Sequence, residues 1–125
     1  MSFTDLEEGA APDAVLNTAA DQIREYFSGV RKTFDLPLRP AGTPFQQSVW
    51  RALQAVPYGK TASYRDIARA IGNENACRAV GGANHVNPIP IVIPCHRVVG
   101  ARGALTGYAG GIEIKKQLLE LEQNR

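Results

Sequence analysis

Two short helical patterns joined by a turn constrain the fold of this chain more than any other feature of its sequence. Ser63 is placed to cap the first helix, Asp66 follows three residues later, and Gly72 is placed to end it. A polar turn over 73–75 then leads into a second helix, expected over about 76–85. Two short helices joined by a tight, glycine-containing turn are typical of a helix-turn-helix.

The second of these helices has an unusually slim surface. It carries Arg78 and the consecutive small residues Gly81, Gly82 and Ala83. Each glycine inside a helix costs about 1 kcal/mol relative to alanine, so two in succession need a reason. Either the helix packs closely against another helix, or it approaches another backbone, such as that of DNA. The pattern leaves both interpretations open.

Apolar residues at helical spacing predict three further helices. The first covers 12–28 and is ended by Gly29, with an inward stripe of Val15, Ala19, Ile23, Tyr26 and Phe27. The second begins at Thr43-Pro44 with Gln46 completing a capping box, and its stripe is Phe45, Val49, Leu53 and Val56. The last covers 112–122, with Ile114, Leu118 and Leu121 inward.

The bulk properties indicate one ordinary globular domain. The chain has 125 residues, of which 44% are hydrophobic and 21% charged. Residues 1–11 lack the basic and apolar regions of a signal peptide and are expected to form a flexible leader. Cys77 and Cys95 could form one bridge, but nothing else points to secretion. We therefore expect a reduced protein without a membrane span, in the cytoplasm or in the nucleus of a eukaryote.

Positive charge is concentrated in one part of the chain. The formal net charge is only +2, yet residues 57–108 carry six Lys and Arg against two acids. A local excess of this kind favours a polyanionic partner, although it is often only a solvated face.

One short segment carries the candidate chemistry. In Ile91–Val99, a β-branched run leads into Pro94-Cys95-His96, and a second apolar run follows. Pro94 restricts itself and Ile93, so Cys95 is expected to leave a strand-like run on a stiff turn. A thiolate is a strong nucleophile, and a nearby histidine commonly generates one. The adjacency alone favours a buried structural cysteine beside a surface histidine, since most free cysteines are inert core residues.

A helix-turn-helix, a basic excess and a Cys-His pair together suit chemistry on a DNA base flipped out of the duplex. The residues that carry this pattern resemble the O6-alkylguanine-DNA alkyltransferases, or methylated-DNA–protein-cysteine methyltransferases. The matching segments are Arg78-Ala79-Val80-Gly81-Gly82-Ala83, Asn87-Pro88, Ile93-Pro94-Cys95-His96-Arg97-Val98 and Gly107-Tyr108. The resemblance runs from about Gly42 to Glu122. It implies an α+β, mostly α domain of winged helix-turn-helix type with a short sheet.

The resemblance also implies catalytic roles. Cys95 is expected to accept the alkyl group, His96 to act on the thiol through a bridging water, and Glu122 to orient His96. Asn87 is expected to brace the turn before the cysteine. Without the resemblance, Glu122 would be taken for a solvated acid and Asn87 for an ordinary loop cap.

Further residues are expected to handle DNA. By resemblance, Arg78 enters the duplex from the minor groove, and Tyr64 crowds a phosphate and donates a proton to the leaving guanine. A surface arginine and a half-buried tyrosine are the ordinary alternatives. The remaining members of the expected interface are a minor-groove face of Gly81, Gly82 and Ala83, pocket walls at Pro90 and Tyr108, main-chain carbonyls near Cys95 and Val98, and a backbone amide at Ala109, where some relatives have serine.

The expected activity is direct repair of duplex DNA. A single SN2 transfer from O6-alkylguanine, and less well from O4-alkylthymine, consumes the protein because nothing hydrolyses the thioether. We expect a monomer without cofactor or metal. Residues 43–125 are expected to form the catalytic and DNA-binding domain, and 12–42 the remnant of a longer N-terminal domain. The alternatives are a non-catalytic sensor of alkylated DNA, which would lack the cysteine, and a DNA-binding regulator switched by alkylation of Cys95.

Overall fold

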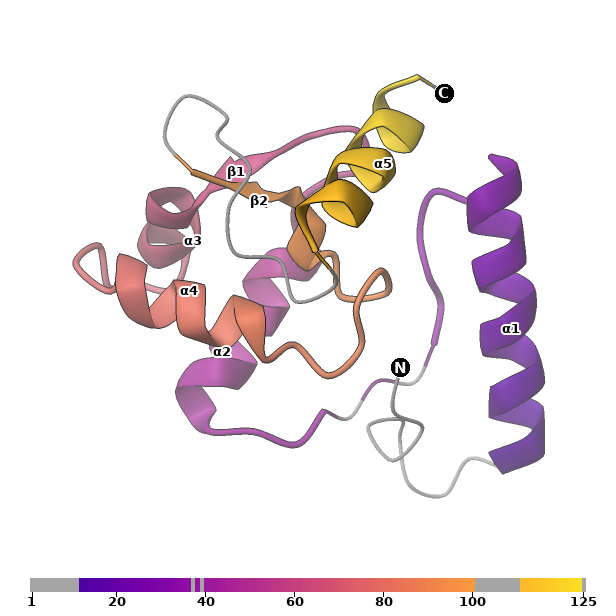
Figure 1. Ribbon diagram of the computed structural model, residues 1–125. Helices are drawn as coiled ribbons and strands as arrows, with labels where there is room; N and C mark the ends of the chain where they lie inside the picture. The colour runs from indigo at the N-terminus through magenta and orange to yellow at the C-terminus, as the bar shows by residue number, and fades with distance from the viewer. Residues whose placement is uncertain (1–11, 37, 39, 101–110, 125) are drawn as a thin grey trace.

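The computed structural model describes residues 12–36, 38, 40–100 and 111–124, and for residues 12–16 the backbone alone. This part of the chain is mostly helical with a small sheet, so the predicted fold class is confirmed (Figure 1). In chain order its elements are α1 (Pro12–Ser28), α2 (Pro44–Gln54), β1 (Ala62–Ser63), α3 (Tyr64–Ala70), α4 (Cys77–His85), the 3₁₀ turn η2 (Cys95–Arg97), β2 (Val98–Val99) and α5 (Ile112–Gln123).

Side-chain caps fix where two of the helices begin. At α2, the amide of Gln46 donates to Oγ1 of Thr43 at 3.1 Å, and the amide of Thr43 donates to Oε1 of Gln46 at 3.0 Å. At α3, Ser63 and Asp66 make the same reciprocal pair, at 3.0 and 2.9 Å. Both capping boxes satisfy amides that the first turn of a helix leaves unbonded. The predicted starts of α2 and α3 are therefore confirmed.

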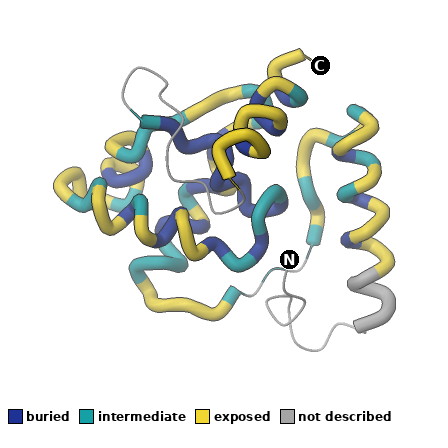
Figure 2. The backbone as a smooth tube through the Cα atoms, viewed as in Figure 1, coloured by how far each residue is buried: buried dark blue, intermediate teal, exposed yellow. Residues whose placement is uncertain are grey.

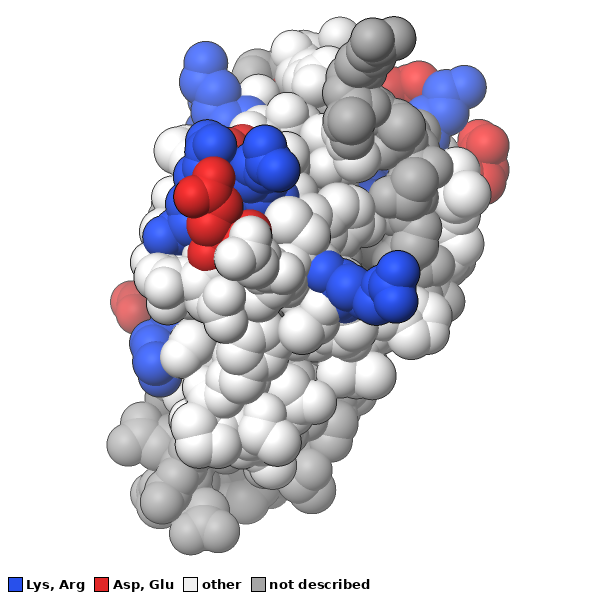
Figure 3. All heavy atoms as spheres, turned by 90° about the vertical axis from the view of Figure 1, so that its left-hand side faces the viewer, with Lys and Arg blue, Asp and Glu red and all other residues white. Residues whose placement is uncertain are grey.

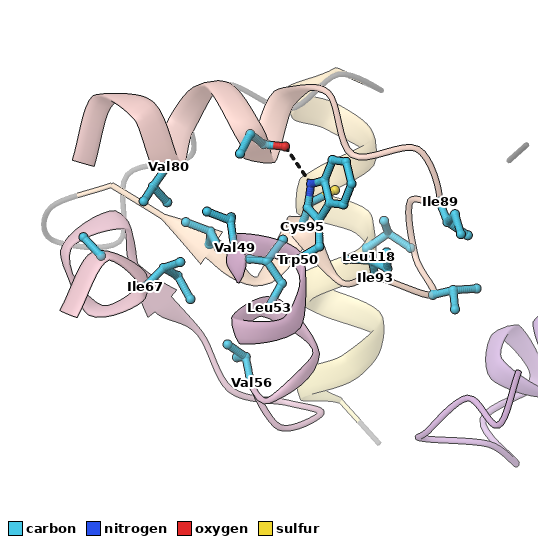
Figure 4. Packing of buried hydrophobic residues seen from close by; sticks show 14 of the residues in the cluster. Val49, Trp50, Leu53, Val56, Ile67, Val80, Ile89, Ile93, Cys95 and Leu118 are labelled. Carbon is cyan, nitrogen blue, oxygen red and sulfur yellow. Dashed lines mark hydrogen bonds between the residues drawn. The ribbon is translucent and has the colours of Figure 1, made fainter. Parts of the chain in front are cut away.

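Helices α3 and α4 form the predicted helix-turn-helix and pack against α2. Gly72 ends α3 with a φ of +78°, a left-handed conformation that glycine adopts without strain. Below these helices lies the core, where Nε1 of Trp50 donates to the carbonyl of Ala83 at 3.0 Å (Figure 4). The buried apolar residues of this core include Val49, Trp50, Leu53, Ile67, Ala68, Val80, Ala83, Ile93, Cys95, Val98 and Leu118.

The small sheet differs from the strand suggested by the sequence. Parallel strands β1 and β2 pair Ala62 with Val98 and Ser63 with Val99. The β-branched run 91–93 is instead a compact turn, in which Ile91 has a φ of +75° and the amide of Ile93 donates to the carbonyl of Ile89 at 2.9 Å. Prolines at 88, 90 and 94 remove the amide donors that a continuous strand would need.

Helix α1 lies at one side of the molecule and is exposed over much of its surface (Figures 1 and 2). Its Gln22 side chain joins it to the following extended segment, because it donates to the carbonyl of Asp35 and accepts from the amide of Asp35, each at 2.9 Å. Tyr26 is fully buried and belongs to the core, whereas Phe27 is exposed.

Helix α5 buries a different stripe from the one predicted. Leu118 is buried as expected, but Ile114 is 48% exposed and Leu121 is only half-buried. The buried stripe also has helical spacing, but it is displaced by one position from the predicted Ile114 and Leu121. Its members are Lys115, Leu118, Leu119 and Glu122. The prediction was wrong because it assumed an apolar stripe, and two of the inward positions are charged. No helix in the described ranges is long and apolar enough to cross a membrane.

Candidate active site

Cys95 opens the 3₁₀ turn η2 and is buried in the core (Figure 4). Two hydrogen bonds hold its backbone: its amide donates to the carbonyl of Ile93 at 2.8 Å, and its own carbonyl accepts from the side-chain Nδ2 of Asn84 at 3.4 Å. The residue is 2% exposed, and in the described part of the chain neither it nor Cys77 forms a disulfide. The thiol is therefore carried by a rigid turn rather than by a mobile loop.

Asn87 spans the turn that precedes the cysteine. Its Nδ2 donates to the carbonyl of Ile93 at 2.7 Å, and its Oδ1 accepts from the amide of Ile89 at 3.0 Å. Both contacts are buried, and they link the two ends of a segment that has few amide donors of its own. The side chain of Asn87 therefore lies across the turn that precedes Cys95.

A buried carboxylate organises the residues beside Cys95. Oε2 of Glu122 lies 2.7 Å from Nε2 of His96 and accepts a 2.6 Å hydrogen bond from the hydroxyl of Tyr26. Arg97 donates from Nε to Oε1 at 2.8 Å and from Nη2 to Oε2 at 3.0 Å. All four side chains are buried. We call Tyr26, His96, Arg97 and Glu122 the Glu122 cluster.

The charges of this cluster decide which nitrogen of His96 is basic. Burial acts to raise the pKa of Glu122, but hydrogen bonds from His96 and Arg97, together with the charge that His96 carries when protonated, lower this pKa to about 2. Glu122 is therefore a carboxylate at neutral pH. Burial lowers the pKa of His96, although Glu122 acts in the opposite direction. A neutral ring facing a carboxylate must carry its hydrogen on Nε2, which leaves the lone pair on Nδ1. This Nδ1 is buried and has no hydrogen-bond partner among the described residues.

Three members of the site were not assigned a role from the sequence. Arg97 was noted only as part of the motif, Tyr26 as part of an apolar stripe, and Lys115 not at all. Lys115 is 0% exposed, and its pKa is lowered by burial while the charge of Cys95 acts to raise it. The one sequence signal that could have identified Arg97 as a site residue is its position two residues after Cys95. For Tyr26 and Lys115 the local sequence contains no comparable signal.

A second group of residues lies on the exposed side of α3 and α4, and we call Tyr64, Arg78, Gly81 and Gly82 the recognition face. Arg78 and Gly82 are exposed, and Tyr64 and Gly81 are half-buried. A Cβ on Gly81 would lie 3.8 Å from the ring of Tyr64, an ordinary contact, and one on Gly82 would meet nothing within 4 Å among the described residues. Close packing among the described residues therefore does not require these glycines, which favours an approach to an external backbone.

The surface around the recognition face is moderately basic. Figure 3 views the end of the molecule that carries α3 and α4, where Lys and Arg gather beside fewer Asp and Glu and next to a broad uncharged area. Such a surface can contact phosphates at its basic edge while small residues approach the duplex.

Not every predicted interface residue lies on that face. Ala83 is 3% exposed and points into the core, because it follows Val80 by one helical turn, so its side chain is not part of the expected groove-facing surface. Val98 is buried at the start of β2, and Pro90 is half-buried and bridged to Ile93. Tyr108 and Ala109 lie outside the described residues.

Comparison with known proteins agrees with this geometry. A family model described as the DNA-binding domain of 6-O-methylguanine DNA methyltransferase matches residues 44–124. The methylated-DNA–protein-cysteine methyltransferases of Methanosarcina barkeri and, in its constitutive form, of Bacillus subtilis are each 58% identical to this chain, over 106 and 109 residues. Those alignments cover 85% and 86% of this chain and 67% and 66% of the relatives, so the chain spans about two thirds of their length.

Solved structures give the same result. Mycobacterium tuberculosis OGT in complex with DNA matches with a TM-score of 0.85 and 56% identity, over 86% of this chain and 67% of that one. S. pombe Atl1, in complex with damaged DNA containing O6-carboxymethylguanine, matches with a TM-score of 0.55 and 38% identity, over 62% of this chain and 74% of that one. This chain therefore belongs to the methylated-DNA–protein-cysteine methyltransferase family, DNA-repair enzymes that transfer an alkyl group from DNA to a cysteine of their own chain.

Proposed function

We propose that this protein repairs O6-alkylguanine in double-stranded DNA, and O4-alkylthymine less well, by moving the alkyl group to Sγ of Cys95. The observation that carries the proposal is the buried Glu122 cluster beside the thiol. Charged groups are costly to bury, and a cysteine that served only packing would not require them as neighbours. A histidine with a fixed Nε2–H and a free Nδ1, next in sequence to the cysteine, is suited to removing the thiol proton.

The proposed step balances as a single displacement. Nδ1 of His96 takes the thiol proton, through a bridging water as the family resemblance implies, and the Glu122 carboxylate stabilises the resulting imidazolium. The Sγ electron pair then forms the S–C bond to the alkyl carbon, while the C–O6 bond breaks and its electron pair passes to the guanine. Tyr64 donates a proton to the leaving base at N3. The thioether has no good leaving group, so each molecule acts once.

The target base must leave the duplex to reach a buried thiol. Arg78 is proposed to fill the space left in the stack, and Gly81 and Gly82 to let α4 lie against the minor groove. Pro90, Tyr108, Ala109 and the carbonyls of Cys95 and Val98 remain the proposed pocket for the base. Asn87 is proposed to keep the turn before Cys95 fixed while the base enters.

Residues 43–125 are proposed as the catalytic and DNA-binding unit. Because its proposed substrate is double-stranded DNA, we expect the protein to act in the cytoplasm, or in the nucleus of a eukaryote.

The test is an intact-mass measurement. The protein is incubated with a short duplex that contains one O6-methylguanine, and its mass is compared with that of an unmodified-duplex control. We expect a gain of one methylene group on Cys95, at no more than one per protein molecule, and no gain in Cys95→Ala. Cys95→Ala should still bind the damaged duplex, because Cys95 is not part of the recognition face.

The alternative is a sensor that binds alkylated DNA without transferring the alkyl group. The similarity to Atl1, whose structure was solved with damaged DNA, supports keeping this alternative. Retained binding of the O6-methylguanine duplex with no mass gain in the unaltered protein would support the sensor and contradict the transferase. Transfer to Cys95 that changes affinity for one particular DNA sequence would point to the regulator.

A further inference from the structure

The active site contains a residue from outside the region that defines the family's DNA-binding domain. Tyr26, on α1, donates its hydroxyl to Oε2 of Glu122 at 2.6 Å across a sequence separation of 96 residues. Tyr26 is 0% exposed and Glu122 is 2% exposed, so no solvent competes for this contact. The family model begins at residue 44, well after α1. The contact thus joins the N-terminal helix directly to the carboxylate that faces His96.

The two oxygens of Glu122 are not equivalent. Oε2 is shared by His96, Tyr26 and Arg97, at 2.7, 2.6 and 3.0 Å. Oε1 faces Nε of Arg97 at 2.8 Å and the amide of Gly59 at 3.5 Å. Hydrogen bonds to one oxygen share the same negative charge. Each donor to Oε2 therefore weakens the hydrogen bonds that the other donors make to it. The tyrosine is the shortest of the three contacts and comes from a separate element.

We propose that Tyr26 is a positioning residue of the alkyl-transfer site, whose hydroxyl holds Oε2 of Glu122 in the orientation and with the charge that His96 requires. The inference rests on the proposed function of Cys95 and His96. It makes α1 an element that positions a group of the 43–125 catalytic unit, rather than only a cover for the core. Burial and the Glu122 carboxylate raise the pKa of Tyr26, so the hydroxyl remains a donor throughout the range in which His96 titrates.

The proposal has a definite consequence for His96. Loss of the Tyr26 hydroxyl leaves more negative charge on Oε2 for the imidazolium, so the pKa of His96 rises. The titratable and charged groups around it lie on every neighbouring element: Tyr26 on α1, Tyr58 between α2 and β1, Cys95 and Arg97 on η2, and Lys115 and Glu122 on α5. Arg97 and Lys115 lower the pKa of His96 and are unchanged by a substitution at Tyr26.

The test compares Tyr26→Phe with a matched control. Phenylalanine keeps the ring, which packs 5.5 Å from the ring of Phe34 and 6.1 Å from that of Tyr58, and removes only the hydroxyl. Tyr58→Phe removes a buried hydroxyl from the same aromatic cluster, one that has no hydrogen-bond partner among the described residues. A purely structural effect would appear in both variants, whereas a positioning effect appears in Tyr26→Phe alone.

The first readout is a heteronuclear NMR titration of the imidazole rings, which needs no alkyl transfer. The chain has two histidines, and exposed His85 serves as the internal reference. In Tyr26→Phe we expect the pKa of His96 to rise by about half to one pH unit, with no change at His85 or in Tyr58→Phe. Incorporation of 3-fluorotyrosine at position 26, a more acidic and therefore stronger donor, should move the pKa of His96 downward.

The second readout is the pH profile of alkyl transfer from free O6-benzylguanine, which excludes effects on DNA binding. The acid limb of the profile should move upward by the same amount in Tyr26→Phe, giving about a three- to tenfold lower rate there. An unchanged His96 pKa in both Tyr26 variants would overturn the proposal, as would equal changes in Tyr58→Phe. If His96 shifts but the unaltered protein transfers nothing, the proposed function fails and the contact between Tyr26 and the Glu122 cluster stands.

Discussion

The Glu122 cluster and the recognition face differ in burial and in hydrogen bonding. In the cluster, four polar side chains are buried and joined by hydrogen bonds of 2.6 to 3.0 Å. On the recognition face, Arg78 and Gly82 are exposed, and a Cβ at position 82 would meet nothing within 4 Å among the described residues. The cluster is complete in the free protein, whereas the recognition face is proposed to gain its partners only when a duplex binds.

This difference predicts which property each region controls. A buried charge network that loses one member leaves another unsatisfied, so changes in the Glu122 cluster should reduce stability as well as chemistry. Exposed side chains make few contacts in the free protein, so removing one changes the free energy of unfolding little. Changes on the recognition face should therefore reduce DNA binding and leave stability intact. Four substitutions test the division, in order of expected effect.

Arg97→Met should cause the largest loss of stability. It leaves the Glu122 carboxylate buried without its two-point partner, and removing one member of a buried ion pair costs about 3–5 kcal/mol. The free energy of unfolding is measured by urea denaturation at pH 7. Lys60→Met, at an exposed position, is the control for loss of a positive charge. A loss below 1 kcal/mol would contradict the idea that the cluster is tightly coupled.

Acid should weaken the protein through Glu122. Its pKa is lowered from 4.5 to about 2 in the folded state, so its contribution is fully present above about pH 5 and is lost as pH falls toward 2. The contribution is about 3 kcal/mol. Glu122→Gln should therefore be less stable than the unaltered protein at pH 6, and the two unfolding free energies should converge near pH 2. Parallel curves between pH 6 and pH 2 would show that the carboxylate is not the group responsible.

Arg78→Ala should separate DNA handling from chemistry. The arginine is exposed, so its loss should leave the unfolding free energy within about 0.5 kcal/mol of the original. Transfer from an O6-methylguanine duplex should slow by about tenfold or more, since stabilising an unstacked site involves a few kcal/mol. Transfer from free O6-benzylguanine should be unchanged. Equal losses on duplex and free base would remove Arg78 from the base-flipping role.

Gly82→Ala should have the smallest effect, and one of opposite sign in the two assays. Alanine favours a helix over glycine by about 1 kcal/mol, and its methyl group would meet nothing within 4 Å among the described residues, so thermal stability should rise. The same methyl group would project toward the proposed groove and should weaken duplex binding by a few fold, measured by fluorescence anisotropy. Gly72→Ala is a useful contrast, because the φ of +78° at Gly72 makes that substitution destabilising. Unchanged affinity in Gly82→Ala would mean that α4 does not approach DNA along this face.

Local features of the sequence were sufficient to predict much of the architecture. Two capping boxes, the terminating glycines and the helical stripes gave the helices close to their observed bounds, because these signals act within a few residues. The sequence failed where position in space mattered more than local pattern. The run 91–93 has strand-forming side chains but is surrounded by prolines, and the inward stripe of α5 contains Lys115 and Glu122 instead of Ile114.

By itself, the sequence determined the capped helices of the helix-turn-helix, the slim glycine pair on α4 and a cysteine followed by a histidine on a proline-stiffened turn. The resemblance to the alkyltransferases had already assigned Glu122 to that histidine. Only the tertiary structure decided which nitrogen of His96 is basic, and that Arg97 and Tyr26 share Oε2 of Glu122 with it. The reason is separation along the chain: Glu122 lies 26 residues from His96 and 96 from Tyr26, and no helical or strand period links residues so far apart. Packing of α1, η2 and α5 brings them together.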